Sequence, residues 1–102
     1  VRFRPEVETS LYRIVQEALN NVAKHSRATR VEIAFEKRAD GFVLIIEDNG
    51  KGFSTKRRRS SGIGLTSMRE RAELIGGTFE LESALKKGTT IYVKVPAASA
   101  MV

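Results

Sequence analysis

The chain has 102 residues, which is enough for one domain with one hydrophobic core. Hydrophobic residues make up 41% of it and charged residues 29%, a composition that excludes a disordered or collagen-like chain. It has no cysteine, which excludes a disulfide framework and thiolate metal sites and fits a reducing compartment. No apolar run approaches the ~18 residues of a membrane span, so we expect a cytoplasmic location, with a membrane-anchored parent protein left open.

The formal net charge is +6, and part of it lies in one basic run of four residues, Lys56, Arg57, Arg58 and Arg59. Such a run is either a solvated loop or an attractor of polyphosphate. The five phenylalanines and two tyrosines fall in no RNA-reading motif. We therefore expect no nucleic-acid partner.

The expected elements follow in chain order. Residues 1–4 form a short strand, and an apolar residue at every third or fourth position predicts a helix over 7–24. Alternation predicts a half-buried strand over 30–37, with Val31, Ile33 and Phe35 on one face. Asp40-Gly41 is a hairpin turn, and 42–48 is a central apolar strand.

Residues 49–62 form a long glycine-rich and serine-rich loop. A second helix follows over 64–75, then strands over 78–83 and 89–95. The domain thus covers 1–96, and 97–102 is expected to be a disordered C-terminal tail. Two helices with four or five strands predict a two-layer arrangement, with both helices on one face of a mixed sheet.

Three polar residues lie along one edge of the first helix. At α-helical spacing, Glu17, Asn21 and Lys24 line one side of the apolar stripe. An amide oxygen can bind Mg²⁺, an ammonium group can meet phosphate, and a carboxylate can order a water or accept a proton. The alternative is the ordinary polar edge of an amphipathic helix.

The central strand ends in a carboxylate and runs into the segment DNGKGF. Strand alternation puts Asp48 on the core-facing side, where a charge needs a hydrogen-bond donor such as an adenine amino group. Gly50 and Gly52 allow the backbone to turn sharply or to approach a flat ring, and a plain turn is the alternative. Thr89 shares the core-facing side of its own strand, where it is either a partner of Asp48 or an ordinary strand threonine.

The segment Gly62-Ile63-Gly64-Leu65 opens the second helix. Backbone N–H groups and the positive end of the helix dipole there can receive an anion. The segment is neither a Walker A loop nor a dinucleotide fingerprint. His25 has no visible metal partner, and we interpret it as a helix C-terminal residue.

The order of these motifs resembles one known group of proteins. A helix containing LYRIVQEALNNVAKHS, then DNGKGF, GIGLTSMRERAELIGG and a final GTT, resembles the GHKL superfamily of ATP-binding domains over residues 5–96. That superfamily includes histidine kinases, DNA gyrase, the large heat-shock ATPases and MutL-type repair proteins. The pattern is most similar to the short-lidded sensor histidine kinases that pair with NarL-type response regulators.

The resemblance implies the Bergerat fold, an α/β (α+β) two-layer sandwich, with ATP and Mg²⁺ as ligands. It implies that Glu17 is the catalytic carboxylate, that Asn21 binds Mg²⁺ and that Lys24 contacts phosphate. Asp48 would bind the adenine amino group, backed by Thr89, in a pocket shaped by Gly50 and Gly52. Residues 53–61 would be the ATP lid, and Gly62, Gly64 and Leu65 would bring backbone N–H groups to the phosphates.

The implied function is transfer of the γ-phosphoryl group of Mg-ATP to a histidine of a separate dimerisation domain in the same protein. His25 does not match that acceptor, so the chain alone lacks it. A response regulator would be an indirect partner, the chain would be monomeric, and its parent would be a homodimer. The alternatives are another GHKL ATPase, such as an anti-sigma serine kinase, and a basic nucleic-acid-binding module, which would leave the four motifs unexplained.

Overall fold

A computed structural model describes residues 2–52 and 65–102. The whole of the expected lid at 53–61, with the basic run at 56–59, and Gly62 and Gly64 lie outside the described residues. The elements are α1 (Pro5–Asn21), a π-helical segment η1 (Val22–Ser26), β1 (Val31–Arg38), β2 (Gly41–Asp48), α2 (Leu65–Leu74), β3 (Thr78–Ser83), β4 (Thr89–Pro96) and α3 (Ala97–Ala100).

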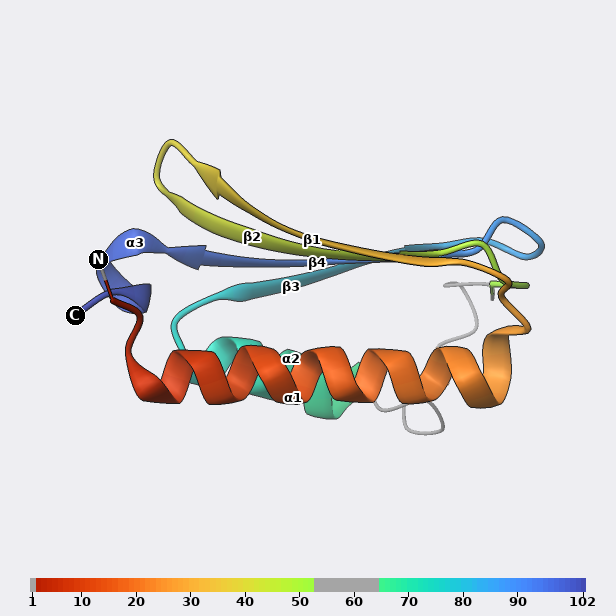
Figure 1. Ribbon diagram of the computed structural model, residues 1–102, viewed down its shortest axis with the longest axis horizontal. Helices are drawn as coiled ribbons and strands as arrows, with labels where there is room; N and C mark the ends of the chain where they lie inside the picture. The colour runs from red at the N-terminus through yellow and green to blue at the C-terminus, as the bar shows by residue number, and fades with distance from the viewer. Residues whose placement is uncertain (1, 53–64) are drawn as a thin grey trace.

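The described elements form two layers, with the sheet on one side and α1 and α2 on the other (Figure 1). The strand order is β1-β2-β4-β3, and every neighbouring pair is antiparallel. The predicted two-layer sandwich is confirmed, but the described sheet is not mixed. β2 and β3 run in the same direction and are joined through α2, yet β4 lies between them, so no parallel ladder forms.

Helix α1 differs from the predicted span of 7–24 at both ends. It begins at Pro5, because proline suits the first turn of a helix and needs no N–H partner there. Glu6 and Glu8 in the same turn complement the helix dipole. At the other end the helix passes into η1, which Arg27 terminates in the left-handed region at φ 57°.

The core lies between the layers. Its buried side chains come from both helices and the central strands, among them Ile14, Met68, Ala72, Leu44 and Val93. Burial of one large aliphatic side chain stabilises the fold by about 1.5–3 kcal/mol, so the apolar stripe of α1 fixes which face of the helix meets the sheet.

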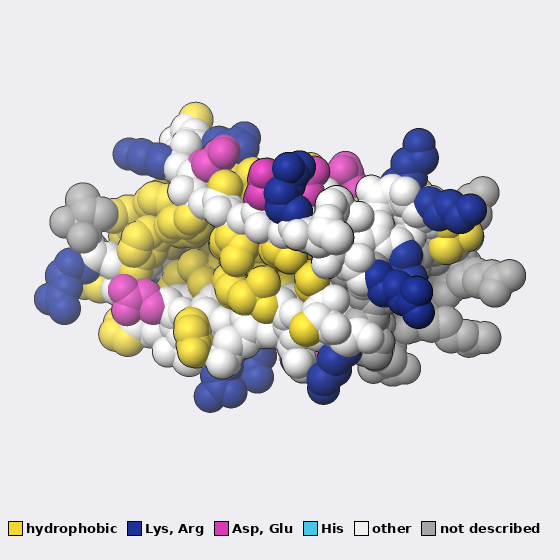
Figure 2. Space-filling model, turned by 45° about the vertical axis from the view of Figure 1, so that its right-hand side comes forward, with side chains coloured by type: hydrophobic (Ala, Val, Ile, Leu, Met, Phe, Trp, Pro, Cys, Tyr) yellow, Lys and Arg dark blue, Asp and Glu magenta, His cyan; other side chains and the backbone are white. Residues whose placement is uncertain are grey.

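Strand β1 is less covered than its alternation predicts. Helix α1 packs on β2, and α2 packs on β3 and β4, so β1 extends past the helical layer. As a result Ile33 and Phe35 remain 47% and 45% exposed, although they point to the helical side. On the face in Figure 2, hydrophobic side chains gather in a shallow hollow between the sheet and the helical layer.

The two chain ends meet, and this differs from both terminal predictions. The expected strand at 1–4 is reduced to one bridge between Phe3 and Met101. The expected disordered tail forms α3, because Ala100 is fully buried and its carbonyl accepts a hydrogen bond from Arg4 N–H at 2.9 Å. Phe3 also packs edge-on against Phe42, with ring centroids 4.9 Å apart.

Candidate functional site: one end of the sheet and the end of helix α1

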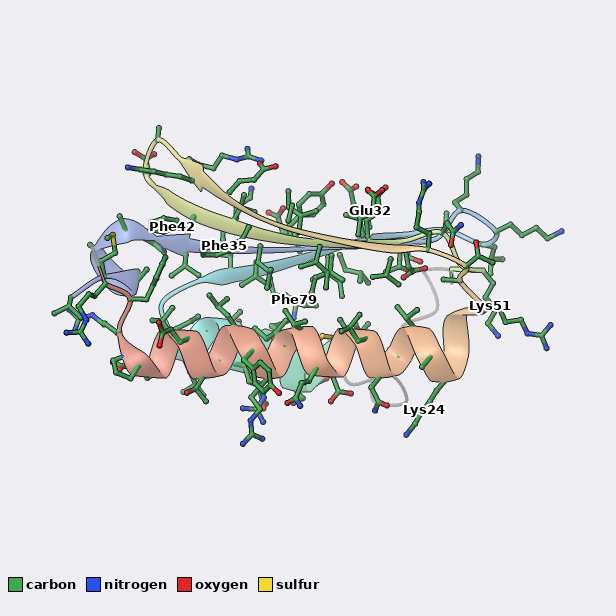
Figure 3. The ribbon with its side chains drawn as sticks, in the orientation of Figure 1. Lys24, Glu32, Phe35, Phe42, Lys51 and Phe79 are labelled. Atoms are coloured by element: carbon green, nitrogen blue, oxygen red, sulfur yellow. The ribbon has the colours of Figure 1, made fainter. Side chains whose placement is uncertain are left out.

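The predicted polar residues of β2 and β4 meet in one row across the sheet. Pairing places Asp48 opposite Thr89 on one side and Val31 on the other, and Thr89 opposite Ser83. The prediction that Asp48 and Thr89 are neighbours is therefore met by the strand register. This row lies at the same end of the molecule as the C-terminal end of α1, where Figure 3 labels Lys24 and Lys51.

The three predicted helix residues are not equivalent. Glu17 and Asn21 lie one turn apart on α1 and are half-buried. Lys24 lies in η1, is exposed, and points away from the sheet (Figure 3). A π-helix closes its hydrogen bonds over one residue more than an α-helix, so Lys24 is rotated from the edge that α-helical spacing predicts.

A tight turn follows Asp48. Its Oδ1 accepts a hydrogen bond from the N–H of buried Gly50 at 2.8 Å, which is the pattern of an Asx turn. Half-buried Asp48 therefore presents its carboxylate on the helical side of the sheet, with its position fixed by strand pairing and by this turn.

Two glycines bring the DNGKG segment against the β3–β4 turn. Gly52 has a φ of +61°, and a Cβ there would overlap the carbonyl oxygen of Ala84 and lie 2.8 Å from that of Gly88. Gly88 has a φ of +80°, and a Cβ there would overlap the carbonyl oxygen of Asp48. Lys86 N–H also donates to the Lys51 carbonyl. The close approach that the sequence predicts at Gly52 is therefore made, within the described residues, by the chain's own backbone.

Ser83 completes the polar row, although the sequence interpretation overlooked it. Its hydroxyl donates to the Gly88 carbonyl at 3.1 Å and lies 2.8 Å from Thr89 Oγ1. Either hydroxyl can be the donor in that pair. The position of Ser83 opposite Thr89 on the neighbouring strand was the signal in the sequence that could have identified it.

Asn49 is the second residue that the sequence interpretation overlooked. Its Oδ1 accepts hydrogen bonds from Thr29 N–H and Arg30 N–H, each at 2.9 Å. Its Nδ2 donates to Thr29 Oγ1 at 2.9 Å, and its backbone N–H donates to the Arg30 carbonyl at 3.2 Å. Since its partners lie about 20 positions earlier in the chain, no local pattern marks it.

At the other side of the site, helix α2 begins at half-buried Leu65 and is tied to β3 by one arginine. Arg69 donates to the Phe79 carbonyl at 3.3 Å, and its guanidinium lies 5.1 Å from the centre of the Phe79 ring. These contacts hold the helix whose N-terminal end was predicted to receive phosphate.

Over residues 6–99 the sequence matches the family described as histidine kinase-, DNA gyrase B- and HSP90-like ATPases. The chain belongs to this family. The recognition of a GHKL ATP-binding domain is thereby confirmed, and with it the α/β sandwich.

Named relatives of this ATPase domain are sensor kinases. The chain is 49% identical over 90 residues to the sensor histidine kinase LiaS of Bacillus subtilis, covering 88% of this chain and 25% of LiaS. It is 38% identical over 95 residues to the signal transduction histidine-protein kinase/phosphatase DegS of Brevibacillus brevis, covering 93% and 25%. The chain thus spans about a quarter of the length of these curated relatives.

A solved structure of a related ATPase domain has the same fold. The ATP binding domain of PrrB from Mycobacterium tuberculosis superposes with a TM-score of 0.75 at 29% identity, covering 87% of this chain and 68% of that one.

None of the helices in the described residues has both the length and the apolar character to span a bilayer. The described residues also hold no group of three or more His, Asp or Glu side chains arranged as a metal site.

Proposed function

We propose that this chain binds Mg-ATP and presents its γ-phosphoryl group to a histidine on another domain of a sensor kinase. The observation that carries the proposal is the polar row of Asp48 and Thr89, which lies at the same end of the molecule as the C-terminal end of α1 with Glu17 and Asn21. Membership of the ATPase family and the names of the relatives support it.

The adenine would lie against the end of the sheet. Asp48 is an acceptor beside Thr89, and adenine offers a donor in its exocyclic amino group. Gly50 and Gly52 keep the turn beside Asp48 tight, so that a flat ring can lie against it.

The phosphates would extend toward α1. The side-chain oxygen of Asn21 suits Mg²⁺, which takes one or two protein oxygens and completes its shell with waters and phosphates. Mg²⁺ would supply charge neutralisation for the phosphate oxygens. Lys24 is proposed as a phosphate contact that reorients from its exposed position. Leu65, with Gly62 and Gly64 outside the described residues, would provide N–H groups at the start of α2.

In the transfer, a nitrogen of the acceptor imidazole forms a bond to the γ-phosphorus while the bond to the β,γ-bridging oxygen breaks and ADP leaves. Catalysis of this step depends mainly on positioning and charge stabilisation. Glu17 is proposed as the carboxylate that orients a water or takes the imidazole proton. The acceptor would belong to a dimerisation domain, since His25 lies in η1, on the binding helix itself.

The remaining functional assignments also stay proposals. They comprise a cytoplasmic domain that continues through α3, beyond the expected end at residue 96. This domain would be monomeric alone and would belong to a homodimeric parent that passes the phosphoryl group to a NarL-type response regulator. The relatives reported above are named histidine kinases, which favours a histidine acceptor over the serine of an anti-sigma kinase.

The test is calorimetric titration of the wild type and of Asp48→Asn with Mg-ATP and Mg-GTP. Loss of a charge-assisted hydrogen bond costs about 1.5–3 kcal/mol, so we expect Asp48→Asn to bind Mg-ATP at least about tenfold more weakly. The ratio of the dissociation constants for Mg-GTP and Mg-ATP should also be smaller for Asp48→Asn than for the wild type. Asp40→Asn, an exposed aspartate in the β1–β2 turn, is the matched control. A wild type that binds while Asp48→Asn binds equally well would overturn the assignment.

A further inference from the structure

The connection between the binding helix and the sheet is hydrogen-bonded to the side chain and the backbone of Asn49. After η1 ends at Ser26, Arg27 takes a left-handed conformation and the chain reaches β1 at Val31. Within this connection of residues 27–30, the backbone N–H groups of Thr29 and Arg30, the Arg30 carbonyl and the Thr29 hydroxyl all bond to Asn49.

The Asn49 amide uses both of its functional groups. Its oxygen accepts two N–H groups, its nitrogen donates to a hydroxyl, and its own backbone N–H adds a fourth bond. These bonds join residues that are about 20 positions apart, and they do so although Asn49 and the connection are largely exposed. Exposed loop backbone of this kind usually bonds to water and moves freely. Four hydrogen bonds to one residue therefore indicate that Asn49 holds the connection in place, and we call Asn49 with these bonds the anchor.

The location of the anchor gives it a functional meaning. Asn49 lies directly between Asp48 and Gly50, at the proposed adenine side of the site. The connection that it holds comes directly after the helix end that carries Asn21 and Lys24, at the proposed magnesium and phosphate side. We propose that Asn49 is a positioning residue that sets the distance between these two sides, an inference that rests on the function proposed above.

The two sides should respond differently when the anchor is lost. Asp48 is held independently, by pairing with Val31 and Thr89 and by its bond to Gly50 N–H. The end of α1 has no sheet pairing, and its π-helical geometry is uncommon and dependent on its surroundings. Loss of the anchor should therefore release the helix end and leave the adenine side in place.

The decisive measurement is the ratio of the dissociation constants for adenosine and for Mg-ATP. Asn49→Leu keeps the size of the side chain and removes its hydrogen bonds. We expect it to weaken Mg-ATP binding roughly tenfold, as loss of an outer-shell partner commonly does, while adenosine binding changes less than about twofold. Asn49→Asp keeps the acceptor for both N–H groups and should restore most of the ratio. Asn20→Leu, an exposed position on α1, is the matched control.

A purely structural role would lower thermal stability without changing this ratio at temperatures where the variant is folded. An unchanged ratio, or an equal loss for both ligands, would overturn the proposal. Amide hydrogen exchange provides a readout without ligand: Asn49→Leu should accelerate exchange over residues 22–30 and leave β2 protected. If the wild type binds neither ligand, the proposed function fails, and unchanged exchange over 22–30 would separately refute the anchor.

Discussion

Replacing Gly52 with alanine should lower the free energy of unfolding for two reasons. The first is conformational, because an L-residue in the left-handed region costs about 1–2 kcal/mol. The second is steric, because the new Cβ would overlap the Ala84 carbonyl oxygen. Backbone cannot rotate away as a side chain can, so the β3–β4 turn must move and the bond from Lys86 N–H to the Lys51 carbonyl is lost. That bond adds about 1 kcal/mol, for a total of about 2–3 kcal/mol.

Gly76→Ala supplies the comparison. Gly76 has a similar φ of +77°, but a Cβ there would lie 2.6 Å from Ser99 Oγ, which can rotate away, and 3.1 Å from Ser99 Cβ, which needs only a small shift. We expect this variant to lose only the conformational part, about 1–2 kcal/mol.

Urea unfolding followed by circular dichroism gives both free energies. The variants should differ by about 1 kcal/mol, or about 4–8 °C in Tm for a domain of this size. Gly52→Ala should also weaken Mg-ATP binding at a temperature where both are folded. Equal destabilisation of the two variants would refute the close approach at Gly52.

Two further predictions concern the face of the sheet that points away from the helices, where Figure 3 labels Glu32. Glu32 pairs directly with Glu47, so Glu47→Gln should raise the free energy of unfolding by about 0.2–1 kcal/mol at low salt, and less at high salt. The charge of Glu82 raises the pKa of Tyr92, whose hydroxyl donates to that carboxylate at 3.4 Å. The stabilisation of the fold by the Tyr92–Glu82 hydrogen bond is present below pH 10 and is lost as the pH rises through the folded-state pKa of Tyr92. In a Tyr12→Phe background, absorbance at alkaline pH should show Glu82→Gln lowering the pKa of Tyr92; no change would refute the contact.

Much of the fold was predictable because apolar residues alternate along the strands and recur at every third or fourth position along the helices. The strand predictions agree with β1–β4 to within one residue, since alternation and the glycine turns mark their ends. Asp48 and Thr89 could be placed side by side from their position on two core-facing rows.

The remainder depends on contacts that no local pattern encodes. The π-helical geometry after Asn21 has no sequence period of its own, so α-helical spacing does not predict the exposed position of Lys24. The bond from Arg4 N–H to Ala100 joins the two ends of the chain, and without it the alanine-rich tail reads as disordered. The partners of Asn49 lie about 20 positions earlier in the chain, so no local pattern marks this residue.

Because the two chain ends meet at Phe3 and Met101, a rotation applied at that end of the domain displaces the opposite end. Both ends lie opposite the end that bears Asp48 and Asn21, in a body 40 Å long (Figure 1). If a further domain is attached there, a rigid rotation of about 15°, of the size that subunits make in switching proteins, moves the far end of this 40 Å body by about 10 Å. Reacting atoms must come within about 3–3.5 Å, so such a swing is enough to bring a bound phosphate to its acceptor or to withdraw it. On the function proposed above, such a rotation would switch phosphoryl transfer on and off without any rearrangement inside the domain.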